Sequence, residues 1–155
     1  MMNKTEWSLL KKDVLISILS TQLVEGERDE MELTTFGNYY ERNGKYYIVY
    51  QESEATGFDG DTTTTVKIEG ENKVTMIRNG ALRSQLIMER GKRHLCHYGT
   101  EYGNIIIGVL TDTITSSLGD GGGKVDFNYT LDIDGALASE NTVRINVKEC
   151  NRDHE

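Results

Sequence analysis

Two histidines and a cysteine lie within four positions, at His94, Cys96 and His97, and these residue types can bind a metal or form a nucleophilic pair. Side chains alternate between the two faces of a strand, so His97 points away from His94 and Cys96 if this stretch is extended. A zinc site needs three or four converging ligands, and a Cys–His pair two positions apart on a strand is separated by roughly 7 Å. We therefore expect no metal site here. Cys96 is expected to be a small buried residue, and both histidines to lie at the rim or surface.

Two other stretches resemble ligand loops but lack residues that those loops require. The glycine-rich stretch 119–124 ends in Lys124 and leads into another strand pattern, whereas a P-loop needs Gly-Lys-Ser/Thr leading into a helix. The stretch that begins at Asp59 starts like a calcium loop, but its twelfth position is Gly70 where the loop requires Glu. We interpret both stretches as turns and predict no cofactor.

Turn signals and alternating side chains predict an all-β protein. The chain has no proline, and turns fall at Gly, Asn and Asp sites about every 8 to 14 residues. The strongest is Asn43-Gly44, because a type I′ hairpin turn needs two positive φ angles. Between turns, as in 125–133 and 143–147, every second residue is apolar, which gives each strand one buried and one wet face. Helix is expected only as a short turn capped by Thr5 and another over 134–141.

Successive hairpins of this kind close most economically into a single antiparallel up-and-down barrel, because closure removes the exposed edges of the sheet. The turn signals divide the chain into about 8 to 10 strands with little helix. We assign residues 13–150 to one barrel domain, with an N-terminal extension over 1–12 and a C-terminal tail over 151–155.

The net charge and the lack of long apolar stretches limit the kinds of partner that this protein is expected to bind. The net charge of −8 repels nucleic-acid phosphates and anionic membranes, so we expect neither as a partner. No stretch approaches the roughly 20 apolar residues of a membrane span, and the first residues lack the apolar run of a signal peptide. We expect a cytoplasmic protein in which Cys96 and Cys150 stay thiols.

Polar residues on otherwise apolar strand faces form the candidate site. Tyr50 and Glu52 share one face of a strand, Arg78 ends a second strand, and Tyr98 and Thr100 share one face of a third. If these faces line the barrel, the side chains gather near one end. Buried charges are usually paired, so Glu52 and Arg78 are expected within hydrogen-bonding reach. The group is then either a structural plug or a set of anchors for a ligand.

Four stretches together resemble the YwiB family of uncharacterised bacterial proteins. They read TTFGNYYERNGKYYIVYQESEATG, TTVKIEGENKVTMIRNGALRSQLIMERG, YGTEYGNIIIGVLTDTI and VDFNYTLDI. The resemblance spans residues 13 to about 149 and implies a calycin-like, lipocalin-type closed barrel, while residues 1–12 lie outside it. It implies no catalytic residues. The positions that carry over are Gly37, Tyr39, Tyr50, Glu52, Arg78, Gly80, Tyr98, Thr100, Gly103 and Thr111.

Three functions are compatible with this pattern. The first is a barrel that binds a small, mostly apolar ligand through a few polar anchors. The second is a non-enzymatic interaction or structural module, as a homodimer for example, whose barrel is filled by its own side chains. The third is an enzyme that uses Glu52, Arg78 and Tyr98 for proton transfer. We favour ligand binding and expect no enzymatic activity, because no catalytic motif is present.

Overall fold

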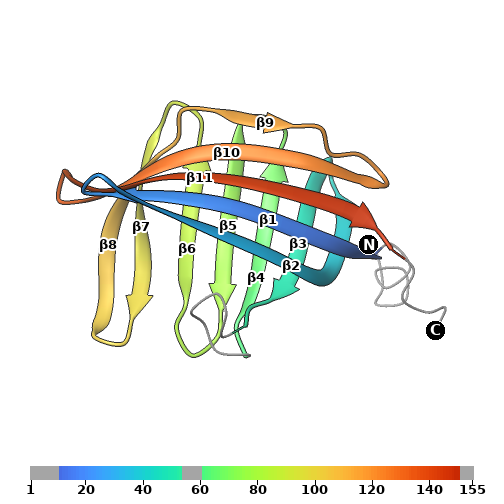
Figure 1. The fold of residues 1–155 in the computed structure, drawn as a ribbon, viewed down its shortest axis with the longest axis horizontal. Helices are drawn as coiled ribbons and strands as arrows, with labels where there is room; N and C mark the ends of the chain where they lie inside the picture. The colour runs from blue at the N-terminus through green and yellow to red at the C-terminus, as the bar shows by residue number, and fades with distance from the viewer. Residues whose placement is uncertain (1–10, 54–60, 151–155) are drawn as a thin grey trace.

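The computed structural model describes residues 11–53 and 61–150, and these ranges contain eleven strands and no helix (Figure 1). The prediction of an all-β fold is confirmed. The strands are β1 (Lys12–Val24), β2 (Glu27–Arg42), β3 (Lys45–Gln51), β4 (Thr63–Glu69), β5 (Lys73–Asn79), β6 (Ser84–Glu89), β7 (Arg93–Thr100), β8 (Gly103–Leu110), β9 (Ile114–Ser116), β10 (Gly122–Ile133) and β11 (Ala136–Glu149).

Antiparallel pairing closes the sheet into a barrel, as predicted. From β1 to β8 each strand pairs with the next along the chain, β8 then pairs with β10, and β10 pairs with β11. Because β11 pairs back onto β1, ten strands form a ring, and the short β9 adds to β10 outside it. The ring thus has ten strands, which is the upper limit of the 8 to 10 strands expected from the turn signals.

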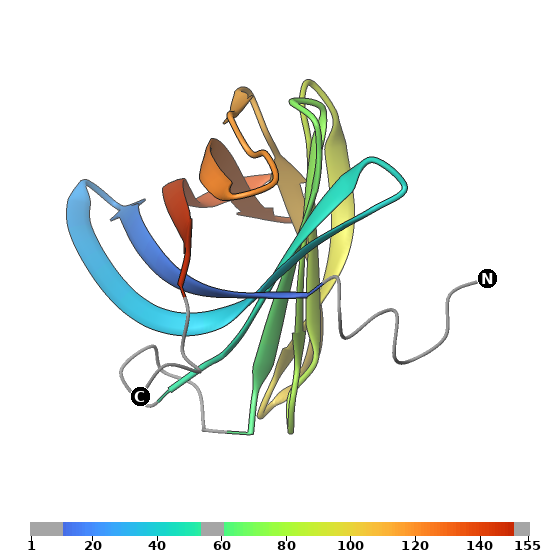
Figure 2. The same ribbon diagram turned by 90° about the vertical axis from the view of Figure 1, so that its right-hand side faces the viewer.

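The barrel is flattened into two layers whose strands cross at a large angle. Strands β3 to β8 form one layer, and the long strands β10, β11, β1 and β2 run across it in front (Figure 1). Viewed from the side, the β1–β2 hairpin curves strongly away from the β3–β8 layer (Figure 2). Twisted strands that cross in this way enclose one core between their inner faces.

Positive φ angles lie where the turn residues predicted them. Asn43 and Gly44 have φ of 53° and 77°, and Asp134 and Gly135 have 53° and 85°, as a type I′ hairpin turn requires. The second turn corrects one prediction, because 134–141 forms no helical turn. Its residues make the β10–β11 turn and the start of β11 instead, since the alternating pattern of 136–149 overrides the weak helical signal.

The core lies between the two layers and is built from the alternating residues. Val125, Phe127, Ile145 and Val147 are each at most 3% exposed, as the period of two predicted. Their neighbours from the other layer include Ile48 and several aliphatic side chains. The buried apolar residues are Val14, Ile16, Ile18, Tyr39, Ile48, Tyr50, Val66, Ile68, Val74, Met76, Leu86, Met88, Cys96, Ile107, Val109, Ile114, Val125, Phe127, Val143, Ile145 and Val147.

Several predictions concern residues outside the described ranges. The helical turn capped by Thr5, most of the extension over 1–12 and the tail over 151–155 lie there. Strand β1 begins at Lys12, one residue before the predicted start of the barrel domain. Within 11–53 and 61–150, no helix has the length and apolar character that crossing a membrane requires.

Candidate functional site

One row of inward side chains crosses five neighbouring strands at the end of the barrel where β3, β5 and β7 finish. The register pairs Tyr50 with Thr64, Thr64 with Arg78, Arg78 with Ser84, and Ser84 with Tyr98. Tyr50, Thr64 and Ser84 are buried, whereas Arg78 and Tyr98 are only partly covered. Two residues further into the barrel the corresponding row is apolar. Its members are Ile48, Val66, Met76 and Leu86. The polar row therefore caps the core at this end.

Glu52 lies just beyond β3 and carries a buried carboxylate. Its backbone N–H donates to the carbonyl of Thr62 at 2.8 Å, which continues the pairing of β3 with β4 by one step. The Thr64 hydroxyl donates to Glu52 Oε1 at 2.8 Å. Burial raises the pKa of the Tyr50 phenol, and the neighbouring Glu52 carboxylate raises it further. Tyr50 consequently stays a neutral hydroxyl at physiological pH.

Arg78 faces this carboxylate at a distance longer than a hydrogen bond. Its Nε lies 3.9 Å from Glu52 Oε1, and the side chains of Arg78 and Glu52 are 19% and 2% exposed. The two charges thus form an ion pair, although Nε and Oε1 are too far apart to hydrogen-bond to each other. Attraction over this distance is effective because Glu52 is shielded from water.

Tyr129 reaches the same region from the opposite layer. It lies on β10, where it follows the inward positions of Val125 and Phe127. Burial raises the pKa of the Tyr129 phenol, Arg78 acts to lower it, and Tyr98 acts to raise it. Tyr129 is therefore within electrostatic range of both side chains and adds a neutral hydroxyl to the site.

The structure brings together four of the five residues singled out from the sequence. Tyr50, Glu52, Arg78 and Tyr98 lie along one polar row and its edge. Thr100 is used differently, since its hydroxyl donates to the Gly103 carbonyl at 2.7 Å within the β7–β8 turn. It shares the strand face of Tyr98, but its hydrogen-bonding capacity serves the turn.

Sequence reasoning missed Thr64, Ser84 and Tyr129 as members of the site. Thr64 belongs to the run of threonines that begins β4 and reads as ordinary strand sequence. Ser84 begins β6, and only the cross-strand register places it between Arg78 and Tyr98. Tyr129 carried a usable signal, because it has the same parity as Val125 and Phe127.

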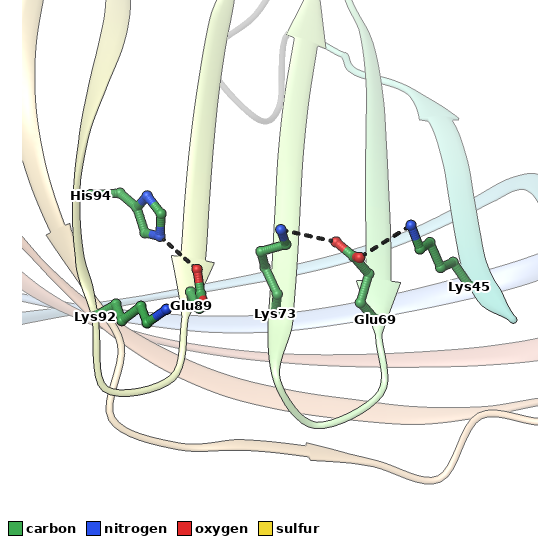
Figure 3. Close-up of polar contacts among 6 residues, drawn as sticks. All are labelled: Lys45, Glu69, Lys73, Glu89, Lys92 and His94. Atoms are coloured by element: carbon green, nitrogen blue, oxygen red, sulfur yellow. Dashed lines mark hydrogen bonds and ion pairs between the residues drawn. The ribbon is translucent and has the colours of Figure 1, made fainter. Parts of the chain in front are cut away.

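The stretch that carries His94, Cys96 and His97 distributes these side chains to three environments. Cys96 is 4% exposed, and its sulfur accepts the Ile87 N–H at 3.4 Å. His94 Nε2 lies 2.9 Å from Glu89 Oε1 (Figure 3). His97 is exposed. Within the described part of the chain, no group of three or more His, Cys, Asp or Glu side chains is arranged to hold a metal ion.

Charged side chains at the opposite end of the β3–β8 layer form a separate, open set. Glu69 lies 3.4 Å from Lys45 and 3.6 Å from Lys73, across three neighbouring strands (Figure 3). Glu69 and Lys73 flank the β4–β5 turn, whereas Thr64 and Arg78 lie toward the other ends of the same strands. Exposed pairs of this type contribute little stability and mark no site.

Two depressions lie near Tyr129. A half-open depression of about 230 Å³ has Tyr129 in its lining, together with Ser20, Thr21, Gln22, Asp29, Glu30, Met31, Asn141, Thr142 and Val143. A wider and more open groove of about 630 Å³ crosses the β1–β2 and β10–β11 hairpins. The lining of this groove is Thr21, Gln22, Leu23, Arg28, Leu110, Asp112, Asn128, Tyr129, Thr130, Glu140, Asn141 and Thr142.

Comparison with known proteins agrees with this architecture. The protein described as "Uncharacterized beta-barrel protein YwiB", from Bacillus subtilis (strain 168), is 25% identical over 126 residues, which cover 80% of this chain and 86% of that protein. The crystal structure of ywiB protein from Bacillus subtilis superposes with a TM-score of 0.79 at 23% identity. That superposition covers 92% of this chain and 94% of the other, so the fold is shared over nearly the whole length.

The family assignment follows from the match to a family model. Residues 16–145, which include every strand from β2 to β10, match the family described as "Domain of unknown function (DUF1934)". The resemblance noted in the sequence is thereby confirmed. The chain belongs to this family, and it is similar in sequence and fold to the β-barrel protein YwiB of Bacillus subtilis.

Proposed function

We propose that this protein binds one small, mostly apolar molecule whose uncharged polar end contacts Arg78, Tyr98 and Tyr129. The observation that carries the proposal is the polar row across β3 to β7, which gathers charged and hydroxyl side chains at one end of the apolar core. Arg78 and Tyr98 are partly exposed, so they are accessible to a ligand.

The charge balance of the site favours an uncharged polar group. Glu52 offsets the charge of Arg78, and the raised pKa values of Tyr50 and Tyr129 keep both hydroxyls neutral. An anionic ligand would have to compete with the Glu52 carboxylate for Arg78. A hydroxyl or carbonyl group can accept from the guanidinium and exchange hydrogen bonds with Tyr98 without displacing Glu52.

The depression that Tyr129 lines limits the size of the apolar part. Its volume of about 230 Å³ is below the roughly 300–1,000 Å³ of drug-sized pockets, which favours a compact ligand. Met31 and Val143 are apolar members of a lining that is otherwise mostly polar. Small closed barrels of the lipocalin type hold single ligands in the same manner, at one end of a packed interior.

We infer binding rather than catalysis from the state of the carboxylate. Glu52 is held by the Thr64 hydroxyl and by Arg78, so it is poorly placed to exchange protons with a substrate. A general base is usually accessible to its substrate, whereas the Glu52 side chain is covered by its neighbours.

Binding can be tested with 1-octanol and octanoate as probes, which share one chain and differ in the charge of their polar end. We expect 1-octanol to raise the melting temperature of the purified full-length protein in a concentration-dependent way, and octanoate to raise it less. Arg78→Met and Tyr98→Phe should abolish the octanol shift. The matched control is Arg144→Met, which removes an exposed arginine from β11.

Native mass spectrometry supplies an independent measurement. A co-purified small molecule present on the wild type and on Arg144→Met, but absent from Tyr98→Phe, supports the proposal. The proposal is refuted if neither probe shifts the melting temperature and no bound mass is found. It is also refuted if Tyr98→Phe and Arg78→Met leave binding unchanged.

A further inference from the structure

The first half of β8 has an open edge in the part of the chain that the structure describes. Strand β7 pairs with β8 along its whole length, from Gly103 to Leu110. On its other side β8 pairs with β10 only at Gly108, Val109 and Leu110, because the chain turns back at 134–135. Figure 1 shows this lower half of β8 at the left of the picture, below the β10–β11 turn.

This edge lacks the features that usually prevent pairing with another chain. Residues 103–107 read GNIII and contain no charge and no proline. Ile105 and Ile106 are 41% and 54% exposed. Soluble proteins generally protect such an edge with lysine, proline or a bulge, so an open apolar edge indicates an interaction surface.

One hydrogen bond fixes which backbone groups face the open side. The Gly99 N–H donates to the Arg83 carbonyl at 3.1 Å, toward β6 and away from β8. Gly99 and its partner Asn104 are therefore a non-hydrogen-bonded pair of the β7–β8 ladder. Because the pattern alternates along a strand, the backbone N–H and C=O groups of Asn104 and Ile106 point to the open edge.

We propose that a second copy of this chain pairs with this edge, antiparallel, about a two-fold axis at Ile105. In this register Asn104 of each copy faces Ile106 of the other, and each pair exchanges both N–H···O=C bonds. Ile105 then faces Ile105 of the other copy in a non-hydrogen-bonded pair, where Cα atoms are about 4.5 Å apart and side chains pack closely.

Two properties of the edge favour a second copy over a strand of another protein. A two-fold arrangement is self-complementary and closed, so it satisfies both edges at once and leaves none open. The edge itself is uncharged, so no like charges are brought opposite one another despite the net charge of −8. A standard interface buries about 1,600 Å² and involves about 20–30 residues on each side. An edge of five residues is much smaller, so the dimer should be weak and dependent on concentration.

Sedimentation equilibrium of the full-length protein over a concentration series tests the pairing. We expect a monomer–dimer equilibrium that Asn104→Pro weakens by at least about tenfold, since proline removes an edge N–H that makes no bond within the monomer. Ile106→Lys places a protective lysine on the edge and should have the same effect. The matched control Leu95→Lys adds the same charge on β7 and should change the dissociation constant by less than about threefold.

Disulfide trapping tests the register. In a Cys150→Ser background, Ile105→Cys should form disulfide-linked dimers under mild oxidation, because two-fold related Cα atoms about 4.5 Å apart suit a disulfide. Ile106→Cys faces Asn104 and should not. A monomer at every concentration overturns the proposal. So does dissociation by Leu95→Lys with no effect of Asn104→Pro, or preferential trapping by Ile106→Cys.

Discussion

Removing one partner of the Glu52–Arg78 pair is the sharpest perturbation of the candidate site. The Glu52 side chain is 2% exposed and the Arg78 side chain 19%, with 3.9 Å between Oε1 and Nε. At that separation two unit charges attract by about 4 kcal/mol at an effective dielectric constant of 20, and by about 1 kcal/mol in water. The measured coupling should fall between these limits, because one partner is buried and the other partly hydrated.

The two single substitutions should differ in their effect on the free energy of unfolding. Arg78→Met leaves a buried carboxylate without its counter-charge, which costs about 3–5 kcal/mol. Glu52→Gln can keep the hydrogen bond from Thr64 and leaves a guanidinium that water still reaches, so we expect a smaller loss of about 1–3 kcal/mol. The double variant should lose less than the sum, with a coupling energy of about 1–3 kcal/mol.

Urea unfolding of the wild type, both single variants and the double variant measures this coupling. The matched control is a cycle on Arg144 and Asp126, an exposed pair 3.2 Å apart, for which we expect less than about 1 kcal/mol. Small, additive losses at Glu52 and Arg78, equal to those of the control cycle, would refute the reasoning. They would show that the pair behaves as a surface pair.

Three further predictions concern other parts of the barrel. Burial raises the pKa of Cys96, so it should react with thiol reagents more slowly than the less buried Cys150, and equal fast labelling of both would contradict this. Hydrogen bonds from Arg93 lower the pKa of Asp132. Arg93→Met should therefore cause its full loss of stability above about pH 4, and a smaller loss as the pH falls through the lowered pKa. Urea unfolding at several pH values would measure this dependence. Gly37→Ala should lower the free energy of unfolding by about 1–3 kcal/mol, because a Cβ there would clash with a β3 carbonyl, and an unchanged stability would contradict this close approach.

The fold could be predicted because local signals and the overall pattern agree. Apolar and polar residues alternate along 125–133 and 143–147. The structure buries Val125, Phe127, Val143, Ile145 and Val147. The Asn43-Gly44 turn followed from the demand for two positive φ angles. Each of these features depends on short-range chemistry, which the sequence carries directly.

The β1–β2 hairpin was harder to predict from short-range chemistry. Its turn at Glu25-Gly26 has φ of 50° and 81°, yet it lies in a polar and acidic stretch without strong alternation. Most residues of β2 before Gly37 are exposed or half-buried, because the hairpin curves away from the core. A strand half that buries no residue fully gives only a weak period-two signal for sequence reasoning to detect.

The site could be predicted in part for a related reason. The parity of Tyr50, Arg78 and Tyr98 on their strands indicated the inner face, but parity alone does not say which residues of different strands lie side by side. That information is in the register, which places Thr64 and Ser84 between them. Thr100 was predicted to belong to the site, but its hydroxyl donates a hydrogen bond within the β7–β8 turn instead.

The ligand and dimer proposals meet on one hairpin but depend on different atoms. Tyr98 pairs directly with Ile105, so the polar row and the open edge are neighbours on β7 and β8. Ligand binding uses the Tyr98 side chain, whereas dimerisation uses the backbone of Asn104 and Ile106. Tyr98→Phe should therefore abolish the octanol shift and leave the dimer dissociation constant unchanged, and Asn104→Pro should do the reverse. If either variant changes both measurements, the hairpin couples the two sites, and the coupling free energy must then be equal in both directions.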